Sequence, residues 1–280
     1  MKVCVDGKFI DSKKAKISAL DNGFLYGDAF YDTMRSYGGQ ILELELHLKR
    51  IEKSANTIGI KLPFSITKIE ELTKKLVTIN KIKDGRIRVT ITRGVNGFDF
   101  LTCKKSALVI TAENIEIDKS AYTKGVDAFT LNLQRPLPEI KMVGLTVMIQ
   151  AYRTVYPKNG YEAILVDDNN TVREGASTNI FLVKNDKLIT SKNKILNGLT
   201  RSRVIALAKS KKIKVVEKDF SKKDLYSADE IFLTNRPREI IPVIKIDGKK
   251  IKNGQVGPTT KKIMEEYQNY IKQYLKKSDQ

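Results

Sequence analysis

The spacing of apolar residues changes from strand-like to helix-like and back along the chain, and this pattern limits the possible folds. Residues 86–93 read RIRVTITR, a strict alternation that is typical of a half-buried strand. Between Leu44 and Ala55 the apolar residues recur every three or four positions, which predicts an amphipathic helix from Glu43 to Ile58. Because strands and helices mix without a regular β-α-β rhythm, we expect an α+β fold.

The same criteria predict the other elements. Asp6-Gly7, between two short apolar stretches, predicts a β-hairpin. We expect further strands at Phe30–Tyr37, Ala107–Ala112, Ala128–Leu133, Ala163–Val166, Asn179–Val183, Lys187–Ile189, Val215–Val216, Glu230–Leu233 and Val243–Ile246. We expect further helices at Ile66–Ile79, Leu145–Tyr156, about 200–210 and 259–275.

A polar segment divides the chain into two parts. The 280 residues are enough for two ordinary domains. Residues 113–125 read ENIEIDKSAYTKG and have no strong period. We therefore expect a linker at 116–124, between an N-terminal α/β domain of residues 1–115 and a C-terminal α/β domain of residues 125–280.

Composition excludes several classes of protein. No apolar run approaches the roughly 20 residues of a membrane-spanning helix, and the N-terminus has no signal-peptide core, so we expect a cytoplasmic protein without a membrane partner. The two cysteines and the single histidine, His47, argue against a metal site and against a histidine-based triad.

The formal net charge of +19 raises the possibility of a nucleic-acid partner. The positive charge is spread along the chain, largely as lysine, and no stripe of arginine and aromatic residues appears. We therefore expect no nucleic-acid partner, and a basic nucleic-acid-binding protein is only a remote alternative, which a salt titration would test.

One lysine stands apart from the others. Lys141 is the only lysine in the apolar segment 140–145. Burial disfavours the ammonium form of a lysine, and the neutral amine is the form that makes a Schiff base. A lysine that extends past apolar neighbours into solvent is the alternative.

Three further features gain meaning beside this lysine. Glu174 ends a strand before small residues and can hold a protonated heterocyclic nitrogen, or be a solvated turn carboxylate. Gly198, Leu199 and Thr200 precede a helix and offer the N–H groups of a phosphate site, or of an ordinary N-cap. Arg50 can form a forked contact to phosphate, or lie on the surface. Together these groups are what a pyridoxal phosphate site needs.

The sequence resembles the class IV, or fold type IV, pyridoxal-phosphate aminotransferases, a family that includes branched-chain aminotransferase, D-amino-acid aminotransferase and aminodeoxychorismate lyase. The resemblance covers nearly the whole chain. It rests on matches at Asp21–Asp28, Tyr31–Arg35, Leu46–Arg50, Thr92–Gly94, Ile140–Lys141, Glu174–Phe181, Asn197–Arg201, Ala228–Thr234, Pro242–Val243 and Ile246–Gly248.

The resemblance implies a two-domain fold with the active site at the domain interface, pyridoxal 5′-phosphate as the cofactor, and a homodimer whose partner chain helps to complete each site. It implies that Lys141 forms the Schiff base and moves protons. Glu174 would pair with the pyridinium nitrogen. Arg50, with the backbone of Leu199 and Thr200, would bind the phosphate.

The resemblance also implies substrate-binding roles for Tyr31, Thr33 and Arg35. Arg236 occupies a position where many relatives have a threonine or serine as a phosphate ligand. Its guanidinium can contact the phosphate or reach the substrate carboxylate, and a solvated loop arginine is the alternative. The role of Arg238 stays open.

The markers of the subfamilies disagree. The loop after Gly94 lacks the Arg-x-His pair of D-amino-acid aminotransferases, and residues 142–146 lack the asparagine and tyrosine of the branched-chain enzymes. Thr33 and residues 233–235 are similar to the lyase. We expect an aminotransferase that moves an amino group between an amino acid, branched-chain-like or of D configuration, and a 2-oxo acid. An aminodeoxychorismate lyase that forms 4-aminobenzoate and pyruvate is the alternative.

Overall fold

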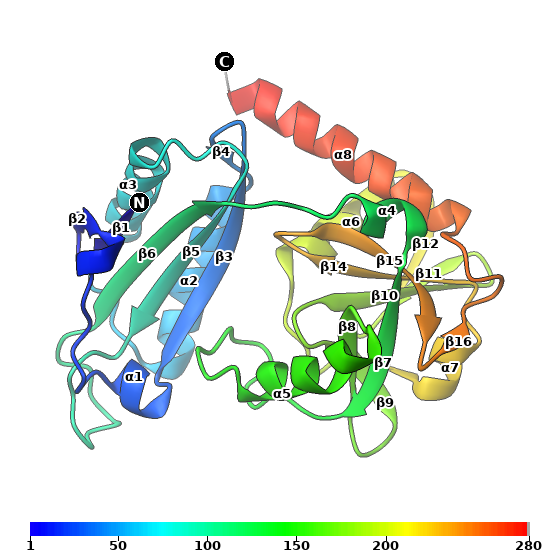
Figure 1. Cartoon of the computed structure of the whole chain (residues 1–280), viewed down its shortest axis with the longest axis horizontal. Helices are drawn as coiled ribbons and strands as arrows, with labels where there is room; N and C mark the ends of the chain where they lie inside the picture. The colour runs from blue at the N-terminus through cyan, green and yellow to red at the C-terminus, as the bar shows by residue number, and fades with distance from the viewer. Residues whose placement is uncertain (279–280) are drawn as a thin grey trace. The chain divides into compact units, whose positions relative to one another are not determined.

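The structure, a computed structural model, describes residues 1–278 and contains two compact units. The first unit comprises Met1–Glu116 and Ile140–Gly144, and the second comprises Ile117–Glu139 and Leu145–Ser278. Figure 1 shows helices and mainly antiparallel sheets in both, which confirms the α+β prediction. No helix within residues 1–278 is long and apolar enough to cross a membrane.

The sheet of the first unit is antiparallel throughout and has the strand order β2-β1-β6-β5-β3-β4. The predicted hairpin at Asp6-Gly7 joins its first two strands. The strands are β1 (Lys2–Val5), β2 (Lys8–Asp11), β3 (Ala29–Tyr37), β4 (Gln40–Ile41), β5 (Gly85–Thr92) and β6 (Ala107–Asn114).

Two helices cover one face of this sheet. α2 (Leu44–Ile58) and α3 (Ile66–Ile79) bury their apolar stripes in one core with Phe30 and Met34 of β3. α2 ends at Gly59, whose φ of 66° is the left-handed conformation that glycine adopts readily, so the predicted end of this helix is confirmed. A short helix, α1 (Asn22–Tyr26), and a 3-10 turn at Ser12–Lys14 complete the unit.

The sheet of the second unit has the strand order β12-β11-β10-β14-β15-β7-β8-β9-β13, and β16 pairs with β15. Its strands pair in parallel at β11–β12, β15–β7 and β7–β8 and antiparallel elsewhere. The strands are β7 (Val126–Asn132), β8 (Glu162–Val166), β9 (Thr171–Gly175), β10 (Asn179–Lys184), β11 (Lys187–Thr190), β12 (Lys214–Glu217), β13 (Phe220–Ser221), β14 (Glu230–Asn235), β15 (Glu239–Ile246) and β16 (Lys249–Lys250).

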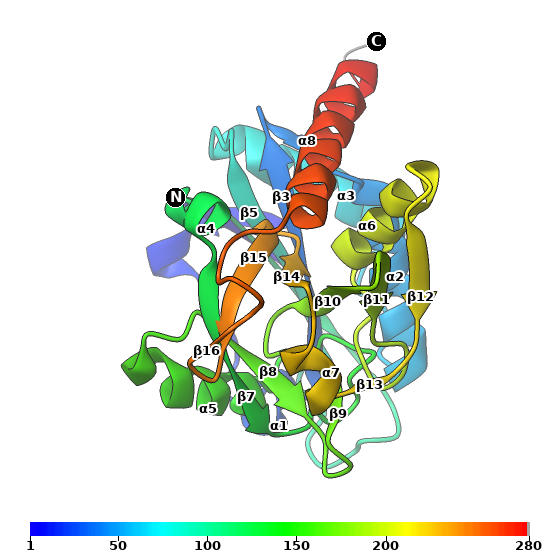
Figure 2. The ribbon, with the colours of Figure 1, turned by 90° about the vertical axis from the view of Figure 1, so that its right-hand side faces the viewer.

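The helices of the second unit pack on this sheet at different places. α6 (Leu199–Ser210) and α8 (Pro258–Ser278) lie side by side and contact β14 (Figure 2). α5 (Thr146–Val155) packs on β7 and β8 through Ala151 and Val155. The remaining helical segments are α4 (Ser120–Lys124), α7 (Lys222–Tyr226) and a 3-10 turn at Tyr156–Lys158.

Two segments differ from the predicted division of the chain. α4 forms within the range expected to be a linker. Lys141, which the sequence boundary assigned to the C-terminal domain, lies in the first unit with residues 140–144. The reason is backbone pairing, because the Tyr31 amide donates to the Lys141 carbonyl at 2.8 Å and the Val143 amide donates to the Ala29 carbonyl at 2.9 Å.

Candidate active site

Lys141 lies beside Tyr31 in the first unit. Its Nζ is 5.0 Å from the centre of the Tyr31 ring, and its side chain is half-buried rather than enclosed by apolar residues. The guanidinium carbon of Arg88 lies 3.6 Å from the same ring centre. The predicted Schiff-base lysine and the predicted substrate residue Tyr31 are therefore neighbours.

Strand β3 separates the other predicted residues of this unit by face. Tyr31, Thr33 and Arg35 share one face because side chains alternate along a strand. Arg88 of β5 pairs with Thr33, so its side chain belongs to the same face. Arg35 is 7% exposed and its guanidinium lies 4.5 Å from the Tyr37 ring.

Arg50 lies on the opposite, helix-covered face of β3. Its Nε and Nη2 donate to the two oxygens of Asp32 at 2.7 and 2.8 Å, and Nδ1 of His47 lies 2.8 Å from the same carboxylate. Burial favours the neutral form of Asp32, but Arg50 and His47 outweigh it and hold the pKa of Asp32 well below its usual range. The Nη1 of Arg50 bonds no group within residues 1–278, so it can contact a ligand.

Glu174 of β9 is 4% exposed and fully engaged in the second unit. Its Oε1 accepts from Nε of Arg135 at 2.9 Å. Its Oε2 accepts from the Leu196 amide at 3.0 Å and from Nδ2 of Asn179 at 3.2 Å. This burial excludes the solvated-turn alternative for Glu174.

The N-terminus of α6 lies against Asn179. A Cβ atom on Gly198 would lie 2.1 Å from Oδ1 of Asn179, so only glycine allows this close approach. Gly198 is the N-cap and supplies no side-chain hydrogen bond, which leaves the first N–H groups of the helix available. The predicted residues Leu199 and Thr200 form the first turn.

Three threonine hydroxyls of the second unit are buried without a hydrogen-bond partner within residues 1–278. They belong to Thr178, Thr200 and Thr234. Thr234 pairs with Asn179 in the β10–β14 ladder, so Thr178 and Thr234 lie near the same end of this ladder. Buried hydroxyls are normally hydrogen-bonded, and these three therefore indicate a polar ligand.

Arg236 and Arg238 follow β14 and differ in environment. Arg236 is 6% exposed, and its Nη1 donates to the Tyr267 hydroxyl at 3.4 Å, which excludes the solvated-loop alternative. The Nη2 of Arg238 donates to Oγ of Ser177 at 2.7 Å.

Sequence reasoning missed four residues of these clusters. Asp32 stands between Tyr31 and Thr33, and its position opposite α2 could have indicated a partner for Arg50. Arg88 could have been found on the polar face of the alternating β5 pattern. No local signal marks Arg135 and Asn179 as partners of Glu174, because these contacts depend on the tertiary fold.

The residues present fit pyridoxal phosphate. The buried hydroxyls and the α6 N-terminus match a phosphate, which accepts several hydrogen bonds and is stabilised by a helix N-terminus. The buried carboxylate of Glu174 matches a protonated ring nitrogen. The amine of Lys141 matches an aldehyde carbon.

Comparison with known proteins identifies the family. The family described as amino-transferase class IV matches residues 29–246. The chain is 37% identical over 278 residues to a putative branched-chain-amino-acid aminotransferase of Methanocaldococcus jannaschii, with 96% of each chain covered. It is 33% identical to a D-alanine aminotransferase of Staphylococcus aureus, covering 98% of this chain and 99% of that protein.

A solved structure agrees with these relatives. The branched-chain amino acid aminotransferase of the organism abbreviated T.th., with pyridoxamine 5′-phosphate, superposes with a TM-score of 0.90 and 27% identity, covering 95% of this chain and 92% of that chain. The matching fold confirms the predicted fold type IV architecture, and the cofactor prediction agrees with the family's use of pyridoxal phosphate. The chain therefore belongs to the class IV aminotransferases, enzymes that depend on pyridoxal 5′-phosphate.

Proposed function

We propose that this enzyme moves an amino group between an amino acid and a 2-oxo acid, and that Lys141 both binds the cofactor covalently and moves the substrate proton. The observation that carries the proposal is the half-buried Lys141 amine, 5.0 Å from the ring centre of Tyr31. When bound, pyridoxal phosphate stabilises the negative charge that develops at the substrate α-carbon.

The side chains around the cofactor have distinct tasks in this proposal. The Nζ of Lys141 takes the proton from the α-carbon and returns it to the neighbouring carbon, as a general base and then a general acid. The carboxylate of Glu174 keeps a proton on the ring nitrogen. Arg135 and Asn179 fix this carboxylate through their hydrogen bonds, so it is oriented before the cofactor binds.

We propose that the phosphate is held by hydroxyl and N–H groups of the second unit and by arginine side chains. The threonines Thr178, Thr200 and Thr234 have buried hydroxyls available, and the Leu199 and Thr200 amides lie in the first turn of α6. Arg50 has Nη1 available and is oriented by Asp32. A buried guanidinium at Arg236 adds positive charge.

Tyr31, Thr33 and Arg35 are proposed to contact the substrate. The cation of Arg88 packs on Tyr31 and holds the ring in place. The two closely related proteins support either a branched-chain amino acid or D-alanine as the amino donor. A cytoplasmic location, expected from the sequence, stays a prediction.

The test uses Lys141→Ala. This variant should lose the visible absorbance of the bound cofactor, and its amino-group exchange should fall by at least about 100-fold. The exposed Lys209→Ala variant is the control and should keep both. Exchange would be screened with individual L- and D-amino acids, which gives the chirality and the class of side chain. Exchange at the native rate by Lys141→Ala would refute the proposal.

Aminodeoxychorismate lyase is the second candidate function, because Thr33 and residues 233–235 are similar to that enzyme. It would use the same lysine and the same cofactor. Incubation of the holoenzyme with aminodeoxychorismate separates the two functions. If no 4-aminobenzoate forms, the lyase is excluded.

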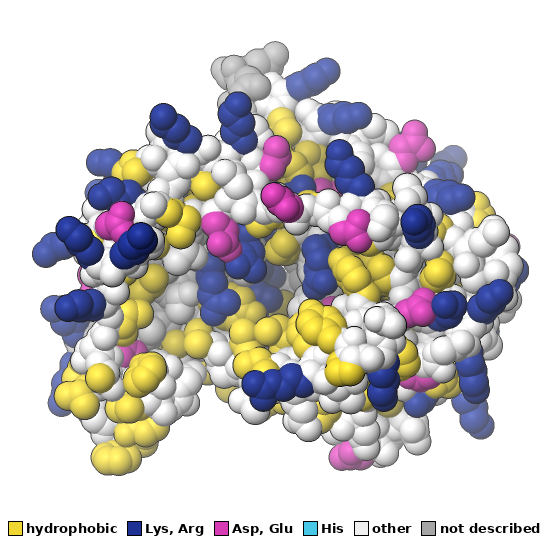
Figure 3. Space-filling view, viewed as in Figure 1, with side chains coloured by type: hydrophobic (Ala, Val, Ile, Leu, Met, Phe, Trp, Pro, Cys, Tyr) yellow, Lys and Arg dark blue, Asp and Glu magenta, His cyan; other side chains and the backbone are white. Residues whose placement is uncertain are grey.

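We further propose that the enzyme is a homodimer. Two segments of the first unit, α1 and the loop 95–101, expose several large apolar side chains, which gather at the lower left of Figure 3. Tyr26, Phe98 and Phe100 pack together with ring centres 5.4 to 6.3 Å apart. We call α1 and residues 95–101 the aromatic platform. Contiguous exposed apolar surface of this kind is typical of a protein interface.

A further inference from the structure

Arg238 lies beside the loop that follows Glu174, and the register of two strands explains why. β10 and β14 pair from Asn179 opposite Thr234. Residues 175–178 precede this pair and residues 235–238 follow it, so both segments lie at the same end of the ladder. Asn235 joins them, because its Nδ2 donates to the Ser177 carbonyl at 3.4 Å and its Oδ1 accepts from the Arg238 amide at 2.8 Å.

The guanidinium of Arg238 is held by hydroxyl groups rather than by a direct ion pair. Its Nη2 donates to Oγ of Ser177 at 2.7 Å and to the Tyr152 hydroxyl at 3.4 Å. Both hydroxyls also bond Oε2 of Glu162, at 2.9 and 3.2 Å. Glu162 is 0% exposed and its oxygen lies 3.8 Å from the Arg238 Nη2, so the hydroxyls connect the two charges.

Part of the guanidinium is available to a ligand. The side chain of Arg238 is 28% exposed, and its Nε and Nη1 donate to no group within residues 1–278. Burial disfavours its charge, but Tyr152 and Glu162 more than offset this and raise the pKa of Arg238 above its ordinary value. Arg238 is therefore a permanent cation with donors to spare.

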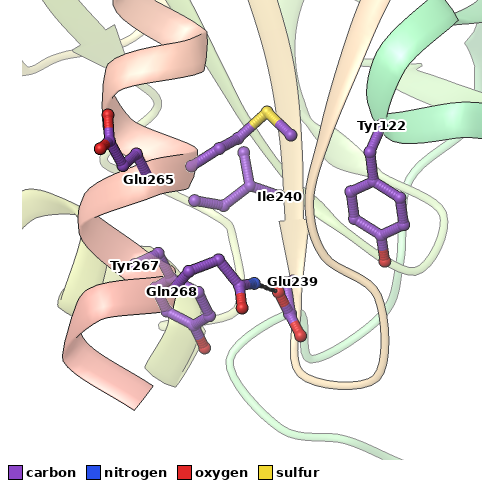
Figure 4. Close-up of a pocket in the computed structure, with 7 residues that line it drawn as sticks. Tyr122, Glu239, Ile240, Glu265, Tyr267 and Gln268 are labelled. Atoms are coloured by element: carbon purple, nitrogen blue, oxygen red, sulfur yellow. Dashed lines mark hydrogen bonds between the residues drawn. The ribbon is translucent and has the colours of Figure 1, made fainter. Parts of the chain in front are cut away.

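The backbone of this turn is also fixed, on the side of α4 and α8. The Tyr122 hydroxyl donates to the Arg238 carbonyl at 2.9 Å. Figure 4 shows Gln268 of α8 bonded to the carboxylate of Glu239, the next residue, around a small pocket. Glu239 has a φ of 59°, an uncommon value for a residue with a side chain. Anchors on both its side chain and its backbone therefore orient Arg238 in advance.

We propose that Arg238 binds a carboxylate of the substrate and that Ser177, Tyr152 and Glu162 are positioning residues for it. The inference rests on the proposed aminotransferase activity, whose amino-acid and 2-oxo-acid substrates all carry a carboxylate. Arginine suits this task because its planar guanidinium makes charge-assisted hydrogen bonds to carboxylates. The loop that holds Ser177 starts directly after Glu174 and Gly175, so the cation lies near the proposed partner of the cofactor ring.

The main test compares Arg238→Met with the wild-type holoenzyme. A lost hydrogen bond to a charged group costs about 1.5–3 kcal/mol, so KM should rise roughly 10- to 100-fold while kcat changes less. Pyruvate and 2-oxoglutarate would be the paired oxo acids. A rise for both supports binding of the carboxylate next to the reacting carbon, and a rise for 2-oxoglutarate alone supports binding of the second carboxylate. An unchanged KM for both would overturn the proposal.

A binding experiment excludes a merely structural effect. Calorimetry of the holoenzyme with 4-methylvalerate should show about 10-fold or more weaker binding in Arg238→Met, whereas binding of the uncharged 4-methylvaleramide should not change. The cofactor absorbance should be the same in both proteins. The exposed Arg153→Met variant, on the same helix as Tyr152, is the control. Equal loss of both ligands would contradict the proposal.

The positioning residues are tested by Ser177→Ala and Ser177→Thr. Ser177→Ala should raise the KM of the carboxylate substrates several-fold, and Ser177→Thr, which keeps a hydroxyl, should restore most of the difference. An equal KM in Ser177→Ala and the wild type would refute the positioning role. A wild-type protein that exchanged no amino group would refute the proposed function, but calorimetry with 4-methylvalerate would still decide whether Arg238 binds a carboxylate.

Discussion

A single buried carboxylate, Asp32, joins β3 to α2 through Arg50 and His47. We expect Asp32→Asn to leave the Arg50 cation without its counter-ion. Breaking a buried ion pair on one side typically costs about 3–5 kcal/mol, so chemical unfolding at neutral pH should show a loss of this size. The variant should also bind pyridoxal phosphate more weakly, because Arg50 would no longer be oriented.

The pH dependence gives this prediction a sign. The pKa of Asp32 is lowered from its ordinary value of 3.8 in the folded state, so its contribution is fully present above that value and is lost as the pH falls below it. The difference between wild type and Asp32→Asn should therefore be largest near neutral pH and should shrink in acid below about pH 4. Glu45→Gln, in an exposed pair with Lys49 on the same helix, should change stability little. A constant difference down to about pH 2 would contradict the role of this charge.

At the scale of elements, the start of α6 depends on the absence of a side chain at Gly198. In Gly198→Ala the new Cβ would meet Oδ1 of Asn179, so either the helix or Asn179 must move. Because Asn179 also bonds Glu174, we expect the dissociation constant of pyridoxal phosphate to rise about 10-fold or more, equivalent to about 1.4 kcal/mol. Spectrophotometric titration of the cofactor measures this, with the exposed Ser202→Ala variant of the same helix turn as control. An unchanged dissociation constant would show that the helix start does not hold the phosphate.

Long periodic elements were predictable, and short ones were not. The apolar stripe of α2 and the alternation of β5 each extend over eight or more residues, so local sequence specifies them. α1, α7, β13 and β16 have only two to five residues and exist because neighbouring strands and loops supply their hydrogen bonds. A pattern cannot indicate an element shorter than its own repeat.

At the scale of the molecule, the sequence indicated which residues matter better than which residues meet. The family motifs contain Lys141, Glu174, Arg50 and Thr200. The partners that orient them come from distant segments, as Arg135 does for Glu174 and β3 does for Lys141. Such contacts follow from strand register and chain return, which no local pattern encodes. The net charge of +19 had little predictive value, because the proposed site uses few of the lysines and arginines.

The aromatic platform leads to a prediction about the whole assembly. Phe98 and Leu101 are 82% and 96% exposed, so replacing them should not disturb the core of the monomer. We expect light scattering after gel filtration to give twice the 31.7-kDa chain mass for the wild type and the single chain mass for Phe98→Asp combined with Leu101→Asp. The buried charge of two aspartates in an apolar interface would oppose association. Ile79→Ser, at the exposed end of α3, should remain dimeric. A wild-type protein of single chain mass, or a dimer that survives both aspartates, would show that the aromatic platform does not hold two copies together.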